Sequence, residues 1–231
     1  MVADMKSYLV DMPPSPPPLT LIDDFDTRRC RFTTFGSAGV GNMKRMEVYY
    51  LTKENILVKP VITTTKLRVP FDTKPYPGSD TLNLVMNLPE SSNLFHTLRR
   101  LDGLVLAVVH HVANETKPNQ SMEVIEALQT KLLNIRADAK YDATFKMKLS
   151  PKTPIKNITS REDIAAQNLL QGDAYAQFAL SQVWLMPNQT FGLQARALRV
   201  KWMPFVSSMT SLGDWTVPEE AAPSLTSQFS D

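Results

Sequence analysis

The chain has 231 residues, of which 43% are hydrophobic and 21% charged, a composition typical of a folded globular protein and unlike that of a disordered polymer. Its formal net charge is +2, and its single cysteine excludes an internal disulfide. No apolar run is long enough to cross a bilayer, and the first residues carry no signal-peptide pattern. We therefore expect a protein that is not secreted and does not enter a membrane, in a reducing compartment.

The first 26 residues are rich in proline. The run PPSPPP at positions 13–18 favours the extended polyproline II conformation, and the acidic stretch DDFD follows it at 23–26. We expect residues 1–26 to form a proline-rich flexible arm, or a strap across the surface of the body.

Strand patterns then surround a helical stretch. Alternating apolar and β-branched residues predict strands at 46–51, 55–71 and 81–88. From about 91 to 135 the apolar spacing becomes that of two helices, at about 91–113 and 121–135. A strand returns at 140–150, where Lys146 and Lys148 alternate with apolar residues, and a short helical turn is expected at 164–170.

The segment 173–202 has the pattern of a β-hairpin with its turn at MPNQTFG. In the second arm Ala195 and Ala197 share one apolar face, but Leu198, Val200 and Trp202 form the apolar set after them. A strand cannot exchange its buried face without a bulge or a bend, and both are common where small barrels close.

These elements together predict a mainly β fold with a helical insertion, an elaborated OB-fold-like β-barrel. We expect a single domain over residues 27–206, with the insertion at about 91–135. Residues 207–231 contain no lysine or arginine and are expected to form an acidic, flexible tail.

Basic residues are concentrated in two parts of the chain. Residues 27–69 contain nine basic and two acidic residues, a local charge of +7, and residues 131–161 contain eight basic and two acidic ones, a local charge of +6. Since the tail is acidic, this distribution indicates a polyanion as the partner of the body.

Motifs for catalysis are missing from the sequence. The stretch FGSAGVGNMKR at 35–45 has glycines followed by Lys44 and Arg45, but the spacing is not that of a P-loop. His96, His110 and His111 match no zinc pattern, and no nucleophile motif is present. We therefore predict no catalytic residues, no metal and no cofactor, and a protein that is not an enzyme.

A binding role for single-stranded nucleic acid fits the pattern better. Such proteins combine a positive groove that follows the phosphates with aromatic side chains on which bases stack. The alternative is that the aromatic rings fill the core and the lysines only solvate the outside; for Trp202, which lies on the apolar register, the core position is the expected one. The predicted contacts are the basic residues Arg29, Arg31, Lys44, Arg45, Lys66, Arg68, Lys140, Lys146, Lys148, Arg196, Arg199 and Lys201, with Tyr49, Tyr50 and Trp202 as stacking residues.

The final strands resemble a known family. The sequence LLQGDAYAQFALSQVWLMPNQTFGLQARALRVKW, preceded by a strand FKMKL, is similar to the single-stranded-DNA-binding proteins of large nucleocytoplasmic DNA viruses, which are themselves similar to OB-fold replication proteins of phages. The resemblance covers about 139–202 and is carried by Val183-Trp184, Phe191-Gly192 and Arg199-Val200-Lys201. It implies sequence-independent binding of single strands in replication, recombination and repair, with no metal or nucleotide.

Proteins of this functional class often end in acidic residues with an aromatic residue that recruits replication enzymes. The resemblance therefore implies Glu219, Glu220 and Phe229 as partner-binding residues, although this tail has few acidic residues.

The leading hypothesis is a viral protein that binds single-stranded DNA, favoured over RNA, in the host cytoplasm or nucleus at sites of viral replication. A homo-oligomer is also considered. The alternative is a virion structural or scaffold protein whose basic patches touch the packaged genome.

Overall fold

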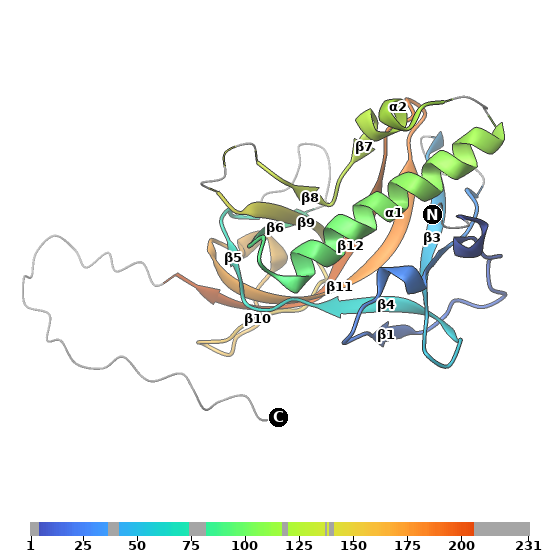
Figure 1. Cartoon of the computed structure of the whole chain (residues 1–231). Coiled ribbons are helices and arrows are strands. Elements are labelled where there is room, and N and C mark those ends of the chain that lie inside the picture. Colours follow the sequence, from blue (N-terminus) through green and yellow to red (C-terminus); the bar gives the residue numbers. More distant parts are fainter. Residues whose placement is uncertain are drawn as a thin grey trace, which may run out of the picture.

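The fold is described from a computed structural model of the chain, which describes residues 5–36, 42–73, 82–116, 120–136, 138 and 141–205. Two helices and a set of strands form the body (Figure 1). The helices are α1 (Asn93–Thr116) and α2 (Met122–Ala127), and the short 3₁₀ turns are η1 (Met5–Tyr8), η2 (Thr27–Arg29) and η4 (Ala166–Asn168). The strands are β1 (Leu19–Leu21), β2 (Cys30–Phe32), β3 (Lys44–Leu51), β4 (Leu57–Thr63), β5 (Leu67–Val69), β6 (Leu82–Leu88), β7 (Gln129–Thr130), β8 (Leu133–Asn134), β9 (Ala143–Leu149), β10 (Ile155–Asn157), β11 (Gly172–Leu185) and β12 (Phe191–Pro204).

The long hairpin β11–β12 is the centre of the sheet. Along the main path the strand order is β1-β4-β3-β11-β12-β9-β6, while β5 and β10 pair with β11 and β12. The prediction of a mainly β fold with a helical insertion is confirmed. The path ends at β1 and β6, which do not pair with each other in the described residues, so the closed OB-fold-like barrel is not confirmed.

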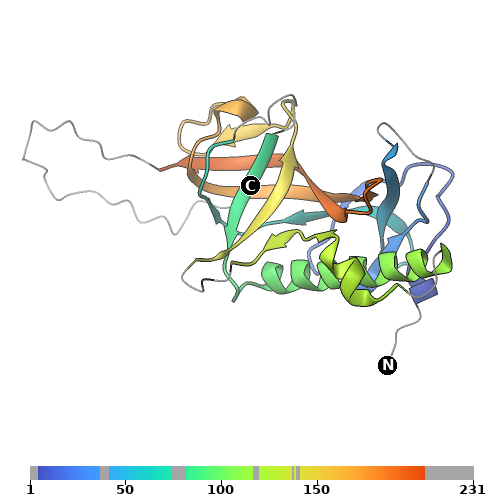
Figure 2. The ribbon, with the colours of Figure 1, turned by 90° about the horizontal axis from the view of Figure 1, so that it is seen from above.

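One face of the sheet is covered by α1 (Figures 1 and 2). The helix begins where the hydroxyl of Ser92 accepts a hydrogen bond from the Phe95 N–H, and its apolar stripe includes Leu98, Leu101 and Val105, all fully buried. These side chains join one core with buried residues from the strands, including Phe145 and Phe178. Because side chains alternate along a strand, the intervening residues of the sheet point away from this core.

The second predicted helix is much shorter than expected. It was predicted over about 121–135, but α2 ends at Ala127 and the chain continues as β7 and β8. The cause is competition with the sheet: the carbonyl of Leu128 accepts a hydrogen bond from the Phe191 N–H, and Gln129 and Thr130 pair with β12. The apolar periodicity of the sequence carries no information about this tertiary pairing, so the predicted helix was too long.

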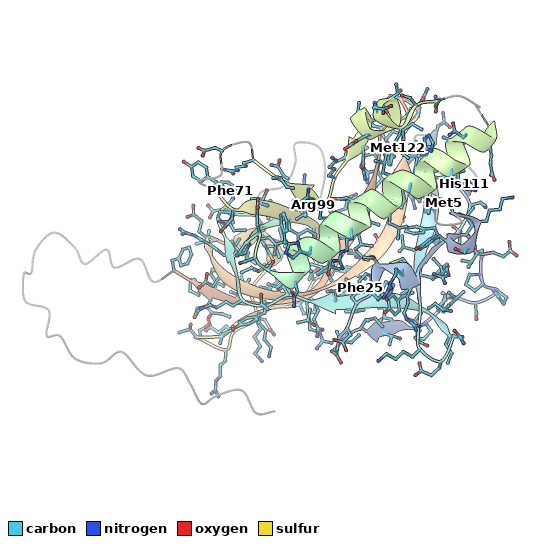
Figure 3. The ribbon with its side chains drawn as sticks, in the orientation of Figure 1. Met5, Phe25, Phe71, Arg99, His111 and Met122 are labelled. Carbon is cyan, nitrogen blue, oxygen red and sulfur yellow. The ribbon has the colours of Figure 1, made fainter. Side chains whose placement is uncertain are left out.

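The described part of the N-terminal segment lies against the body as a strap, one of the two arrangements considered for it. β1 pairs with β4 in parallel, and Leu9 bridges to Phe32. Figure 3 shows Met5 and Phe25 on the side where this segment meets α1, and both side chains pack against the core.

The exchange of buried face in the second hairpin arm is caused by a bulge, as predicted. Gln177 pairs with Arg199 and Phe178 with Ala197, so Leu198 is the extra residue. A second irregularity leaves Ser181 without a partner in β12. The hairpin therefore keeps one continuous outward face along its whole length.

Candidate nucleic-acid interface

The outward face of the hairpin and its neighbours carries a row of cations, here called the basic face. On β12 the exposed residues are Arg196, Arg199 and Lys201. Arg196 pairs with Lys148 of β9, and Lys201 pairs with Lys156 of β10, so each adds a second cation beside the row. The complete basic face consists of Arg45, Lys146, Lys148, Lys156, Arg196, Arg199 and Lys201, all exposed.

Most of these cations have no protein partner. Within the described part of the chain, no hydrogen bond or ion pair engages the side chains of Arg45, Lys148, Arg196, Arg199 or Lys201. By contrast Lys59, which lies at the margin, is paired with Glu47. Cations that are not neutralised within the protein are available to an anionic ligand.

Two aromatic side chains lie among the cations. Trp184 and Tyr175 are both on the outward register of β11 and are half-buried. Trp184 pairs with Arg45 of β3 and with Gly192 of β12, and Tyr175 pairs with Lys201. The row of cations therefore has an aromatic ring near each end, Trp184 near one and Tyr175 near the other.

The indole of Trp184 lies against a glycine. A Cβ at Gly192 would be 2.9 Å from Cζ2 and 3.2 Å from Cε2 of Trp184, and 2.6 Å from the carbonyl oxygen of Thr130. Only a residue without a side chain allows the ring to approach the sheet this closely. The glycine thus gives the indole a rigid backing.

A recess of about 480 Å³ surrounds this indole. Its wall includes Thr130, Lys131 and Leu132 from the β7–β8 segment, and Lys146 and Lys148 from β9, with Trp184 from β11. The recess thus combines an aromatic ring with ammonium groups.

The positive charges at this recess act on one another. Partial desolvation lowers the pKa of Lys148 below its ordinary value, and the positive charges of Arg45 and Lys146 lower it further. This like-charge repulsion is a cost to the free protein, and a bound phosphate would relieve it.

A second groove continues the basic face at its other end. It has a volume of about 570 Å³ and combines the apolar residues Leu19, Leu21 and Leu198 with Arg199 and Lys201. Leu19 is 59% exposed and Leu21 49% exposed, although both are large and apolar. The strap therefore adds an apolar shelf beside the cations.

The predicted stacking residues do not have that role in the structure. Tyr49 and Tyr50 are buried, with the ammonium of Lys59 placed 4.2 Å from the centre of the Tyr49 ring and Phe25 packed on Tyr50. Trp202 is 5% exposed and belongs to the core, as its apolar register indicated. The adjacency of two tyrosines misled the prediction, since the strap and Lys59 cover the face that a lone strand would expose.

Several predicted basic residues have other tasks. Arg29 donates to the carbonyls of Leu51 and Thr52, and Arg31 donates to the carbonyls of Arg28 and Cys30, so both hold backbone.

Three more lie away from the basic face or at its end. Lys44 is exposed beside a different pocket, formed with α2 and the hairpin turn. Lys66 is 3.8 Å from the carboxylate of Asp173, and Arg68 stacks on Phe205 at 4.9 Å. The other predicted residues, Lys140, Glu219, Glu220 and Phe229, lie outside the described residues.

Sequence reasoning named neither Trp184 nor Tyr175 as a stacking candidate, and it did not include Lys156 among the candidate cations. The outward register of β11 could have been found from the alternation Asp173, Tyr175, Gln177, but Trp184 follows the irregularity at Ser181 and so appears on the wrong parity.

Other kinds of site find little support in the described residues. They contain no group of histidine, cysteine and carboxylate side chains arranged to hold a metal ion. Neither α1 nor α2 has an apolar stretch of the length that a bilayer requires. His110, one of the histidines considered above, faces the carbonyl of Gln120 and the amide of Asn114.

Comparison with known proteins gives matches among solved structures only. No family model matches the chain, and no curated protein matches it. It is similar to gp2.5, a single-stranded DNA binding protein encoded by bacteriophage T7, at 11% identity and a TM-score of 0.46, over 71% of this chain and 98% of that one.

It is also similar to the single-stranded DNA-binding protein from bacteriophage Enc34. In complex with single-stranded DNA that protein matches at 13% identity and a TM-score of 0.39, over 73% of this chain and 93% of that one. Without DNA it matches at 14% identity and a TM-score of 0.39, over 78% of this chain and 98% of that one. Both are phage proteins, and neither shows a link to large nucleocytoplasmic DNA viruses. These TM-scores are below 0.5, so the matches do not by themselves indicate a function.

Proposed function

We propose that this protein binds single-stranded DNA independently of sequence, with the phosphates on the basic face and a base on Trp184. The observation that carries the proposal is the recess in which an indole, backed by Gly192, lies beside Lys146 and Lys148. Single-strand binders combine these two elements: cations for the backbone and an aromatic face for the bases.

The geometry favours a single strand over a duplex. In a duplex the bases are stacked on one another, so none is available to the Trp184 ring without unstacking. The cations of β12 form one row, from Arg196 to Lys201, which suits one phosphate chain. Stacking also accepts every base, so it supports binding without sequence preference.

The proposed cellular role is in DNA replication, recombination or repair, processes that expose single strands. Replication proteins are proposed partners through the acidic tail. The proposed location is the host cytoplasm or nucleus, at sites of viral replication.

The test is fluorescence anisotropy of labelled oligo-dT, a duplex of the same length and oligo-U over a salt series. We expect oligo-dT to bind more tightly than the duplex. With about five phosphates neutralised, log K should fall against log salt with a slope of about −3 to −4, since each phosphate contact contributes about −0.7 for single strands. Equal affinity for duplex and oligo-dT, or binding that ignores salt, would overturn the proposal; tighter binding of oligo-U would move it to RNA.

The site is tested by a double variant, Lys148→Gln with Arg196→Gln, which removes the cross-strand pair of cations. We expect weaker binding and a salt slope shallower by about 1.4, two contacts at about 0.7 each. The matched control is Lys53→Gln with Lys152→Gln, two exposed lysines outside the basic face, which should leave the slope unchanged.

A further inference from the structure

Asp102 is a buried carboxylate on α1 that the proposed binding does not use. It is 6% exposed, and its two oxygens accept hydrogen bonds from the N–H groups of Leu132, at 2.9 Å, and Leu133, at 3.3 Å. Its own carbonyl accepts a third hydrogen bond, at 2.8 Å, from the side chain of Gln129. One residue of the helix therefore holds three points of the β7–β8 segment.

This segment fills a split in the sheet. β12 and β9 pair at Arg196 and Lys148, whereas β7 pairs with the start of β12 and β8 pairs with the start of β9. Between β7 and β8 the chain turns a corner. Buried N–H groups need an acceptor, and at this corner the carboxylate of Asp102 supplies it.

The corner is also a wall of the Trp184 recess. Lys131 and Leu132 line the recess, and the carbonyl of Thr130 lies against Gly192, which backs the indole. A shift of the β7–β8 segment would therefore move the wall and the backing of the proposed base-binding position.

We propose that Asp102 is a positioning residue for single-stranded DNA binding: it fixes the β7–β8 segment from behind the sheet and so shapes the recess around Trp184. The inference rests on the proposed function. Asp102 does not touch the ligand, and its effect is transmitted through the hydrogen bonds to Leu132 and Leu133.

If only the charge of Asp102 mattered, its removal would change the affinity for DNA in the direction opposite to that expected from a positioning role. Removing a negative charge near a cationic face should strengthen the binding of a polyanion. In Asp102→Asn one of the two acceptor oxygens is replaced by a donor, so one N–H group at the corner loses its partner. We expect Asp102→Asn to bind oligo-dT several-fold more weakly, with an unchanged salt slope. The control Asp24→Asn removes the same charge from an exposed position and should bind equally or slightly more tightly.

The pH dependence provides a second readout. Burial raises the pKa of Asp102 to about 6, while the two N–H groups and the charge of Lys131 oppose the shift. Below pH 6 the carboxyl takes up a proton and one oxygen becomes a donor. We therefore expect the affinity of the wild type to fall between pH 7 and 5 relative to that of Asp102→Asn, which has no proton to gain.

Hydrogen exchange separates failure of this inference from failure of the proposed function. In the free protein, the amides of Leu132 and Leu133 should exchange faster in Asp102→Asn. If they do, and oligo-dT binds both proteins equally, the positioning role is wrong while the binding function stands. If the wild type does not bind oligo-dT at all, the proposed function fails regardless of the exchange. Tighter binding by Asp102→Asn would also overturn the inference.

Discussion

At the residue scale, the exposure of an aromatic ring depends on what covers it, which the ring's own sequence neighbours do not reveal. Tyr49 lies on the same face of β3 as Glu47, which pairs with the outward-facing Gln182 of β11. The ammonium of Lys59 nevertheless lies over the Tyr49 ring. Among the described residues no cation or second ring stacks on Trp184, and the indole is backed by Gly192. We therefore propose the stacking role for Trp184, which only the strand pairing identifies, in place of the predicted tyrosines.

Replacement of Trp184 tests this assignment. Trp184→Ala should weaken oligo-dT binding by about 1–3 kcal/mol, roughly 5- to 150-fold, because that is the usual contribution of one stacked base. Trp184→Phe should retain most of the affinity. Tyr49→Leu removes a ring that is buried, so the folded variant should bind like the wild type. Anisotropy measures all three variants, and a full effect at Tyr49 with none at Trp184 would reverse the assignment.

Lys148 is the residue at which stability and binding should oppose each other. Its pKa is below the ordinary lysine value of 10.5, so in the folded state it loses its proton at lower pH than in the unfolded chain. In the window between the two values the unfolded state binds more protons, and stability therefore rises with pH. The affinity for DNA changes in the other direction, since the neutral amine no longer attracts phosphate.

We therefore expect Lys148→Met to raise the melting temperature and to weaken oligo-dT binding. In the wild type, raising the pH from 8 to 10.5 at constant ionic strength should reduce affinity earlier than in Lys148→Met, where this group is absent. Calorimetry and anisotropy over this range are the measurements. If Lys148→Met were less stable than the wild type and bound oligo-dT equally tightly, that result would contradict the like-charge repulsion at this recess.

At the element scale, the hairpin depends on its bulges. The bulge at Leu198 was predictable because alternation in β12 visibly changes phase between Ala197 and Leu198. The irregularity at Ser181 was not predictable, since alanines and a glutamine around it fit either face. The sequence therefore places Arg196, Arg199 and Lys201 on one face, but simple alternation along β11 places Trp184 on the wrong face.

Two glycines of the hairpin give a matched pair of variants. A Cβ at Gly192 would contact the carbonyl of Thr130 and the ring of Trp184, and a Cβ at Gly172 would overlap the carbonyl oxygen of Met203. Each alanine variant should lose about 1–3 kcal/mol of stability, as is usual for overpacking. Only Gly192→Ala should also weaken DNA binding by the folded protein, because it displaces the indole. Urea unfolding and anisotropy distinguish the two effects; equal binding by both variants would argue against the indole as the base contact.

At the scale of the whole molecule, the sequence predicted the strand regions of β3, β4, β5, β6 and β9, the first helix and the hairpin, but neither the short strands β1, β2, β7, β8 and β10 nor the order of strands. Alternation and helical period are local properties, whereas the pairing of β7 with β12 and of β1 with β4 depends on contacts far apart in sequence. For the same reason Lys146, Lys148, Arg196, Arg199 and Lys201 were placed on an outward face, and these side chains are exposed. Arg29 and Arg31, by contrast, hold backbone carbonyls.

The length of the basic face predicts the size of the binding site. From Gly192, beside Trp184, to Lys201 the path along β12 is about 30 Å, at about 3.3 Å per residue. A single strand with the duplex spacing of about 3.4 Å per nucleotide would place about nine nucleotides on this path, and a stretched strand fewer. Affinity for oligo-dT should therefore rise with length and level off between about four and nine nucleotides, within the range known for such domains.

Because Tyr175 lies at the Lys201 end, Tyr175→Ala should weaken binding of the longest oligomers in this range and leave the shortest unaffected, provided that these occupy the Trp184 end. Anisotropy with dT oligomers of increasing length measures both, and affinity that keeps rising well beyond this length would mean that the ligand follows a longer path than the basic face.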